Sequence, residues 1–141
     1  MRVLIAVDGS EKSSKAVEYA IRIARECKTP MELHLLNVQL PITFGDIKKY
    51  VSQEALDSYY RDEGNKALRR ARDLLDEAGL DHTDHIAVNQ IAEAIHAYAE
   101  AKRCGQIIMG TRGLGALTSL LLGSVASKVL HLTNIPVTLV K

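Results

Sequence analysis

The sequence predicts a doubly wound α/β fold, because short apolar runs alternate with longer amphipathic segments along the whole chain. The runs are rich in β-branched and aliphatic residues and lack a regular in/out alternation. Strands have this composition when helices cover both faces of a parallel sheet. We therefore expect a single domain over residues 1–141 with five strands, most or all of them parallel. The expected strands are residues 3–7, 33–38, 86–88, 107–109 and 137–140.

Four helices are expected between these strands, because apolar residues recur there with the helical period. The second helix should run from about Ser52 to Ala78 and end at Gly79, a residue suited to the left-handed conformation that follows many helices. In chain order, the four apolar stripes are Val17, Ala20, Ile21 and Ala24; Leu56, Tyr60, Gly64, Ala67, Ala71, Leu74 and Ala78; Ile91, Ala94, Ile95 and Tyr98; and Leu122, Val125, Ala126 and Val129.

Charge and composition exclude several classes of protein. The formal net charge is +1, so no overall field favours nucleic acid or an anionic membrane. The sequence starts with Met1 and Arg2 followed by an apolar run, without the features of a signal peptide, and no apolar stretch approaches membrane-spanning length. Cys27 and Cys104 match neither a redox dithiol nor a zinc pattern. We expect a cytoplasmic protein with two reduced thiols and no nucleic-acid or membrane partner.

A doubly wound sheet binds its ligand outside the carboxyl ends of the strands, where the winding changes direction. The first strand end is followed by Asp8, Gly9 and Ser10. For Gly9 and Ser10 we favour a structural role, since serine caps helices and glycine eases a bend. Asp8 is a stronger candidate for a ligand contact, because a carboxylate at the end of a buried strand needs a polar partner.

The fourth strand is followed by Gly110, Thr111, Arg112 and Gly113, then nine residues, then Gly123 and Ser124 at the start of the last helix. Glycine lets the backbone approach a phosphate closely, and a helix N-terminus offers unpaired N–H groups. Each residue alone would suit a plain loop with a capped helix. As a spaced set between a strand and a helix, they favour a phosphate site. The Walker and dinucleotide fingerprints do not fit this stretch.

The pattern G-x2-G-x9-G-S at Gly110, Gly113, Gly123 and Ser124, with Asp8 after the first strand, resembles the ATP-binding branch of the universal stress protein family. The resemblance covers essentially the whole chain. It implies a Rossmann-like sheet of order 3-2-1-4-5, of the adenine nucleotide alpha hydrolase-like type. It also implies a homodimer through the last strand, residues 137–140.

The resemblance also implies a role for each site residue. Asp8 would hold the adenosine end of ATP, and the backbone of Val38 would pair with the adenine edge. Gly110 would allow close approach near the ribose. The phosphates would be bound by Gly113, Gly123, Ser124 and Val125, with Mg²⁺ or another divalent ion held mainly by the nucleotide. The sequence departs from the family at residues 89–91 and 105–106, where it reads Asn-Gln-Ile and Gly-Gln.

Three functions remain open at this point. The first is an ATP-binding regulatory protein in which nucleotide occupancy sets a conformation or dimer surface for an unknown downstream partner. The second is a slow ATPase or adenylating enzyme, although no general base or other catalytic residue is identifiable. The third is a dimeric scaffold that uses no nucleotide.

Two further segments have weaker signals. Residues 81–85, Asp-His-Thr-Asp-His, could ligate a metal, but we favour a polar surface connection before a strand. Residues 39–50 are long for a βα connection and are interpreted as a lid or partner surface, or equally as a mobile loop.

Overall fold

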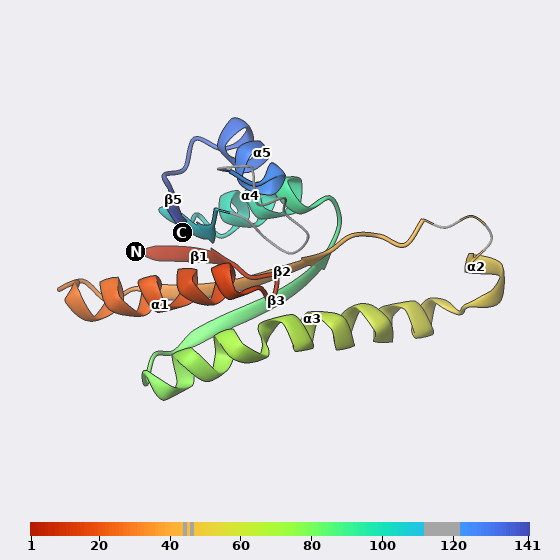
Figure 1. The fold of residues 1–141 in the computed structure, drawn as a ribbon, viewed down its shortest axis with the longest axis horizontal. Helices are drawn as coiled ribbons and strands as arrows, with labels where there is room; N and C mark the ends of the chain where they lie inside the picture. Colours follow the sequence, from red (N-terminus) through yellow and green to blue (C-terminus); the bar gives the residue numbers. More distant parts are fainter. Residues whose placement is uncertain (44, 46, 112–121) are drawn as a thin grey trace.

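The computed structural model describes residues 1–43, 45, 47–111 and 122–141, and its centre is a five-stranded parallel sheet (Figure 1). The strand order is β3-β2-β1-β4-β5, with every neighbouring pair parallel, which confirms the predicted doubly wound arrangement. In the centre of the sheet, Ile5 lies level with Leu35 on one side and Ile108 on the other. The strands are β1 (Arg2–Ala6), β2 (Glu32–Gln39), β3 (His82–Val88), β4 (Gln106–Gly110) and β5 (Val137–Val140).

Helices cover both faces of this sheet, which explains why its inner strands are apolar on both sides. One core lies under α1 (Glu11–Glu26) and α3 (Gln53–Glu77) and includes Val3 and Ile5. The other lies under α4 (Ile91–Ala101) and α5 (Ser124–Leu132) and includes Leu4. Successive residues of β1 therefore enter opposite cores, as the two-residue period of a strand requires.

The four predicted helices are present, and α3 begins and ends as expected. Ser52 is its N-cap and accepts a hydrogen bond from the Ala55 N–H, and Gly79 follows the helix with φ +69°. In the second half of the predicted stripe of α3, Ala71 is buried as expected, but the positions on either side of it are shifted by one residue. Leu68 and Leu75 are fully buried, whereas Ala67 and Leu74 are half-buried. Both pairs are adjacent and apolar, so the sequence offers two neighbouring stripes, and the helix turns the stripe of Leu68 and Leu75 toward the sheet.

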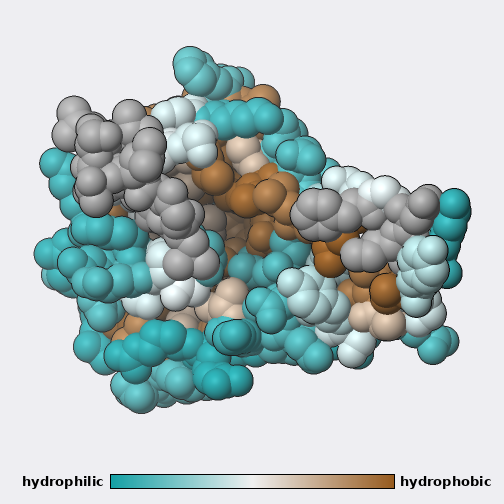
Figure 2. Space-filling model, turned by 45° about the vertical axis from the view of Figure 1, so that its right-hand side comes forward, coloured by the Kyte–Doolittle hydropathy of each residue, from teal (hydrophilic) through white to brown (hydrophobic). Residues whose placement is uncertain are grey.

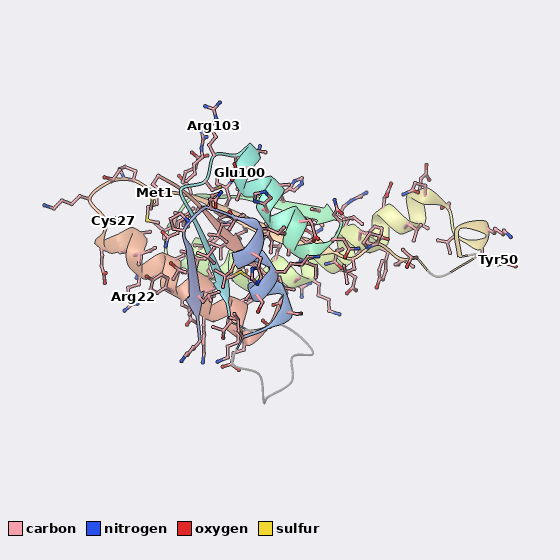
Figure 3. The ribbon with its side chains drawn as sticks, turned by 90° about the horizontal axis from the view of Figure 1, so that it is seen from above. Met1, Arg22, Cys27, Tyr50, Glu100 and Arg103 are labelled. Carbon is pink, nitrogen blue, oxygen red and sulfur yellow. The ribbon has the colours of Figure 1, made fainter. Side chains whose placement is uncertain are left out.

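Two other segments differ from expectation. A four-residue helix, α2 (Ile47–Tyr50), lies in the connection after β2. Figure 1 shows α2 and the amino-terminal part of α3 projecting beyond the sheet as an arm, and Tyr50 lies at its tip with 85% of its surface exposed (Figure 3). Residues 82–85, interpreted as a connection, belong to β3. They are polar because β3 is an edge strand with largely exposed side chains.

In the part of the chain that the structure describes, no helix has the length and apolar character needed to cross a membrane.

Candidate nucleotide site

The turn after β1 positions Asp8 at the carboxyl edge of the sheet. The Ser10 N–H donates to Asp8 Oδ1 at 2.9 Å, which closes a short turn. Ser10 is the N-cap of α1, and its Oγ accepts from the Ser13 N–H at 3.2 Å. Gly9 has φ +84°, and a Cβ there would lie 3.2 Å from Ala67 Cα of α3. The structural roles predicted for Gly9 and Ser10 are thus confirmed, and they hold the Asp8 turn in place.

Asn37 is a buried polar residue beside this turn that the sequence interpretation missed. Its side chain is 2% exposed, and its Nδ2 donates to the Val7 carbonyl at 2.8 Å. Its Oδ1 accepts a hydrogen bond from the Gln39 side chain. The amide therefore ties the end of β1 to the end of β2, next to Val38. The available signal was a polar residue inside an otherwise apolar strand.

Gly110, the last residue of β4, lies against the first turn of α1. A Cβ at Gly110 would lie 2.9 Å from Lys12 Cβ and 3.1 Å from the Lys12 carbonyl carbon and oxygen. Because real Cβ atoms essentially never come so close, helix packing alone requires glycine here. The space into which a side chain at position 110 would extend is thus filled by α1.

A backbone hydrogen bond brings the two ends of the predicted phosphate loop together. The Gly123 N–H donates to the Thr111 carbonyl at 2.6 Å, and the Thr111 N–H donates to the Val140 carbonyl at 3.0 Å. The N-terminus of α5 is therefore fixed at the end of β4. Gly113 lies outside the described residues, so its predicted role has no structural test.

Within the described residues, the first turn of α5 has no side-chain cap. Gly123 is the N-cap, with φ −70° and ψ 158°, and no described side chain accepts a hydrogen bond at this position. The backbone N–H groups of Ser124 and Val125 belong to this turn, and Ser124 itself is exposed. A helix N-terminus of this kind attracts anions through its N–H groups and its dipole. These residues fit a phosphate group.

The face at which the strands end is hollowed and apolar between the two grey segments of Figure 2. At this end of the α4 and α5 side, several apolar side chains are only half-buried, namely Val38, Ala87, Ile91, Leu122 and Val125. Val38 and Ala87 are paired in the sheet. An apolar surface beside a helix end that is predicted to bind anions suits a ligand with a flat ring system and a phosphate.

A separate groove of about 320 Å³ lies at the outer edge of the sheet, between α3 and β3. It is lined by Asp57, Tyr60, Arg61, Ile86 and Val88, and none of the predicted site residues contributes to it.

An ion pair between Lys128 of α5 and Glu93 of α4 joins the two helices on this side of the sheet. The hydrogen bond from Lys128 lowers the pKa of the Glu93 carboxyl, so the pair is charged at neutral pH. The pair helps to fix α5, at whose N-terminus the phosphate site is predicted.

The histidines and carboxylates of residues 81–85 do not form a metal site with other described residues. Asp84 is paired with Arg72, and His82 Nε2 lies 3.1 Å from Asp76 Oδ1. Among the described residues, no group of three or more His, Cys, Asp or Glu side chains could hold a metal ion.

Sequence comparison identifies relatives over the whole chain. The model of the universal stress protein family matches residues 1–141. A universal stress protein of Methanocaldococcus jannaschii is 33% identical over 144 residues, covering 99% of this chain and 81% of the relative. The universal stress protein YxiE of Bacillus subtilis is 29% identical, covering 99% of this chain and 98% of the relative.

Solved structures share the fold. The universal stress protein UspA from Lactobacillus plantarum has a TM-score of 0.83 at 20% identity, covering 100% of this chain and 97% of its own. Three other universal stress proteins were solved with a nucleotide. One contains cAMP (TM-score 0.73, 24% identity), one from Arabidopsis thaliana contains AMP (0.71, 21%), and one from Archaeoglobus fulgidus contains dAMP (0.71, 20%). All three matches cover 100% of this chain. They cover 97% of the solved chain with cAMP, 91% of the one with AMP and 98% of the one with dAMP.

Proposed function

The chain belongs to the universal stress protein family, and from this premise we propose that it binds ATP at the carboxyl ends of β1 and β4. The observation that carries the proposal is the N-terminus of α5, which no described side chain caps and which the bond between Gly123 and Thr111 fixes to the end of β4. The phosphates would lie against Gly113, Gly123, Ser124 and Val125.

The nucleoside would lie toward β1 and β2. Asp8 supplies a carboxylate for the ribose hydroxyls, the Val38 backbone supplies polar groups for the adenine edge, and the half-buried apolar side chains supply its flat faces. Gly110 lies between the two halves of the site. Mg²⁺ or a similar ion would be held mainly by phosphate oxygens, which are the hard ligands such cations prefer.

We propose a regulatory role, in which ATP changes the surface offered to a protein partner. The relatives with cAMP, AMP or dAMP support a family site for adenine nucleotides. Among the described residues assigned to the nucleotide, Asp8 is the only carboxylate, and the others contribute backbone groups, the Ser124 hydroxyl and apolar side chains, which suit binding rather than proton transfer.

Calorimetry with ATP and Mg²⁺ tests the proposal, and we expect a dissociation constant in the micromolar range, about −8 kcal/mol. Gly123→Val should abolish this binding with the fold intact, because the backbone angles of Gly123 are open to valine and the added side chain would block the phosphate approach. Gly113→Val should act in the same way.

Gln90→Val is the matched control. It places the same side chain at the N-cap of α4, another helix start without a side-chain cap, which follows the edge strand β3. Its affinity for ATP should equal that of the wild type. Absence of heat at millimolar ATP, or equal affinity in the wild type and both glycine variants, would refute the proposed site. Turnover of about 10 per second would instead indicate an enzyme.

A further inference from the structure

Lys12 lies at the junction between α1 and the proposed phosphate site. It is the second residue of α1, and its Cβ and backbone occupy the space next to Gly110. In a helix, the Cα–Cβ bonds tilt toward the N-terminus. Since α1 begins at the carboxyl edge of the sheet, the Lys12 side chain starts out toward that edge.

The charge of Lys12 has no counterpart in the described part of the chain. Lys15, one turn further along α1, pairs with Glu11 at 3.5 Å, and Lys128 pairs with Glu93. No ion pair or hydrogen bond of the Lys12 ammonium occurs among the described residues, although its side chain is half-buried.

The position of this charge is also unfavourable for the helix itself. A cation in the first turn opposes the helix dipole, which favours acidic residues there. Glu11 satisfies this preference and Lys12 does not. A cation that has no partner among the described residues, opposes the dipole and contacts Gly110 is explained by an anion that arrives from outside the chain.

We propose that Lys12 determines how many phosphates the site prefers, by supplying a positive charge to the distal phosphates of the nucleotide. This inference rests on the proposed ATP site and adds a residue outside the glycine pattern. Because Lys12 acts on the phosphates, its contribution to the binding affinity should grow from AMP to ADP to ATP. It should vanish for adenosine, which has no phosphate.

The test compares Lys12→Gln with Lys15→Gln and Lys12→Arg, using titrations of the full chain with adenosine, AMP, ADP and ATP in the presence of Mg²⁺. For Lys12→Gln we expect about a tenfold weaker affinity for ATP, a smaller loss for AMP and no change for adenosine. Lys15→Gln should match the wild type for all four ligands. Lys12→Arg should retain the affinity for ATP, since it keeps the charge.

A thermal melt of the ligand-free variants separates binding from folding. Removing a cation from the first turn should leave the melting temperature of Lys12→Gln unchanged or slightly raised. If the wild type binds ATP and Lys12→Gln binds it equally well, the inference is wrong while the proposed function stands. The same conclusion holds if Lys12→Gln weakens the affinity for adenosine as much as the affinity for ATP. If the wild type binds none of the four ligands, both are wrong.

Discussion

The two cysteines, Cys27 and Cys104, lie in opposite environments. Cys27 is exposed just after α1, whereas Cys104 is 6% exposed and belongs to the core under α4 and α5 (Figure 3 labels Cys27). Burial raises the pKa of the Cys104 thiol, because the thiolate would lose its hydration. Burial likewise raises the pKa of the nearby Tyr98 hydroxyl.

These shifts predict a loss of stability at alkaline pH. A raised pKa in the folded state means that folding favours the protonated thiol. The contribution of the thiol to the free energy of unfolding is therefore complete below the unfolded pKa of about 8.5, and it is lost as the pH rises through the higher folded pKa. The free energy of unfolding, measured in urea, should therefore fall above about pH 8.5. Cys104→Ala should show a smaller fall than the wild type, and Cys27→Ala should show the same fall. An identical pH profile for Cys104→Ala would contradict this assignment.

The residues of the candidate site differ in how far the sequence could reveal them. Ser10 and Gly123 have local signatures, because caps and loop glycines follow from their neighbours in the chain. Lys12 has none, and Asn37 has only its polarity within an apolar strand, because their roles come from contacts with Val7 and Gly110, which are distant in sequence. Pattern reasoning finds residues whose role is local and misses those whose role is created by the fold.

At the scale of elements, α3 and β3 pack unusually closely at Gly64. A Cβ at this position would lie 2.6 to 2.8 Å from three side-chain atoms of Ile86. The whole side chain of Ile86 is involved, so a small rotation cannot relieve the contact.

Gly64→Ala should therefore destabilise the wild type by about 1–3 kcal/mol, although alanine is the better helix former. In an Ile86→Ala background the same change should become neutral or stabilising by up to about 1 kcal/mol, because the obstacle is gone and the helix propensity remains. Urea unfolding of the four proteins in this double-mutant cycle gives the sign in each background. A destabilisation of equal size in both backgrounds would show that Ile86 is not the cause.

Element types were predictable, but the edges of elements were less so. The inner strands are apolar because both faces are covered, and this composition identifies them from sequence alone. The first half of β3 was missed because its side chains face water and its strand character comes from pairing with β2, as in His82 with Leu33. The face of α3 was misplaced where adjacent apolar residues, such as Ala67 and Leu68, offer two stripes.

At the scale of the molecule, β5 leaves one edge of the sheet open. The Pro136 and Val140 carbonyls accept hydrogen bonds from β4 and the residue after it, so the backbone groups of Val137 and Leu139 point away from the sheet. All four residues of β5 are half-buried. An open edge of this kind can pair with its own copy about a two-fold axis.

We predict a homodimer formed by antiparallel pairing of β5, and Leu139→Pro is the variant that tests it. Proline removes a donor from the open edge without removing one from the ladder with β4. Sedimentation at low micromolar concentration should shift from dimer to monomer, whereas Leu139→Val, which keeps the donor, should stay dimeric. Circular dichroism of both variants checks that the fold is retained. A monomeric wild type, or a dimeric Leu139→Pro that is folded, would exclude this interface.

Because α3 extends past the sheet, its two halves should differ in how fast their backbone hydrogen bonds open. A helix of 25 residues is about 37 Å long, while the seven residues of β3 span about 23 Å, so the amino-terminal turns extend past the sheet. Amide protons in those turns can exchange with solvent through local fraying. Those around Leu68 and Leu75 lie over the core and exchange only when the sheet itself opens. One continuous helix thus contains hydrogen bonds that open early and hydrogen bonds that open late, and the arm can change its contacts while the site beside Asp8 and Gly110 keeps its geometry.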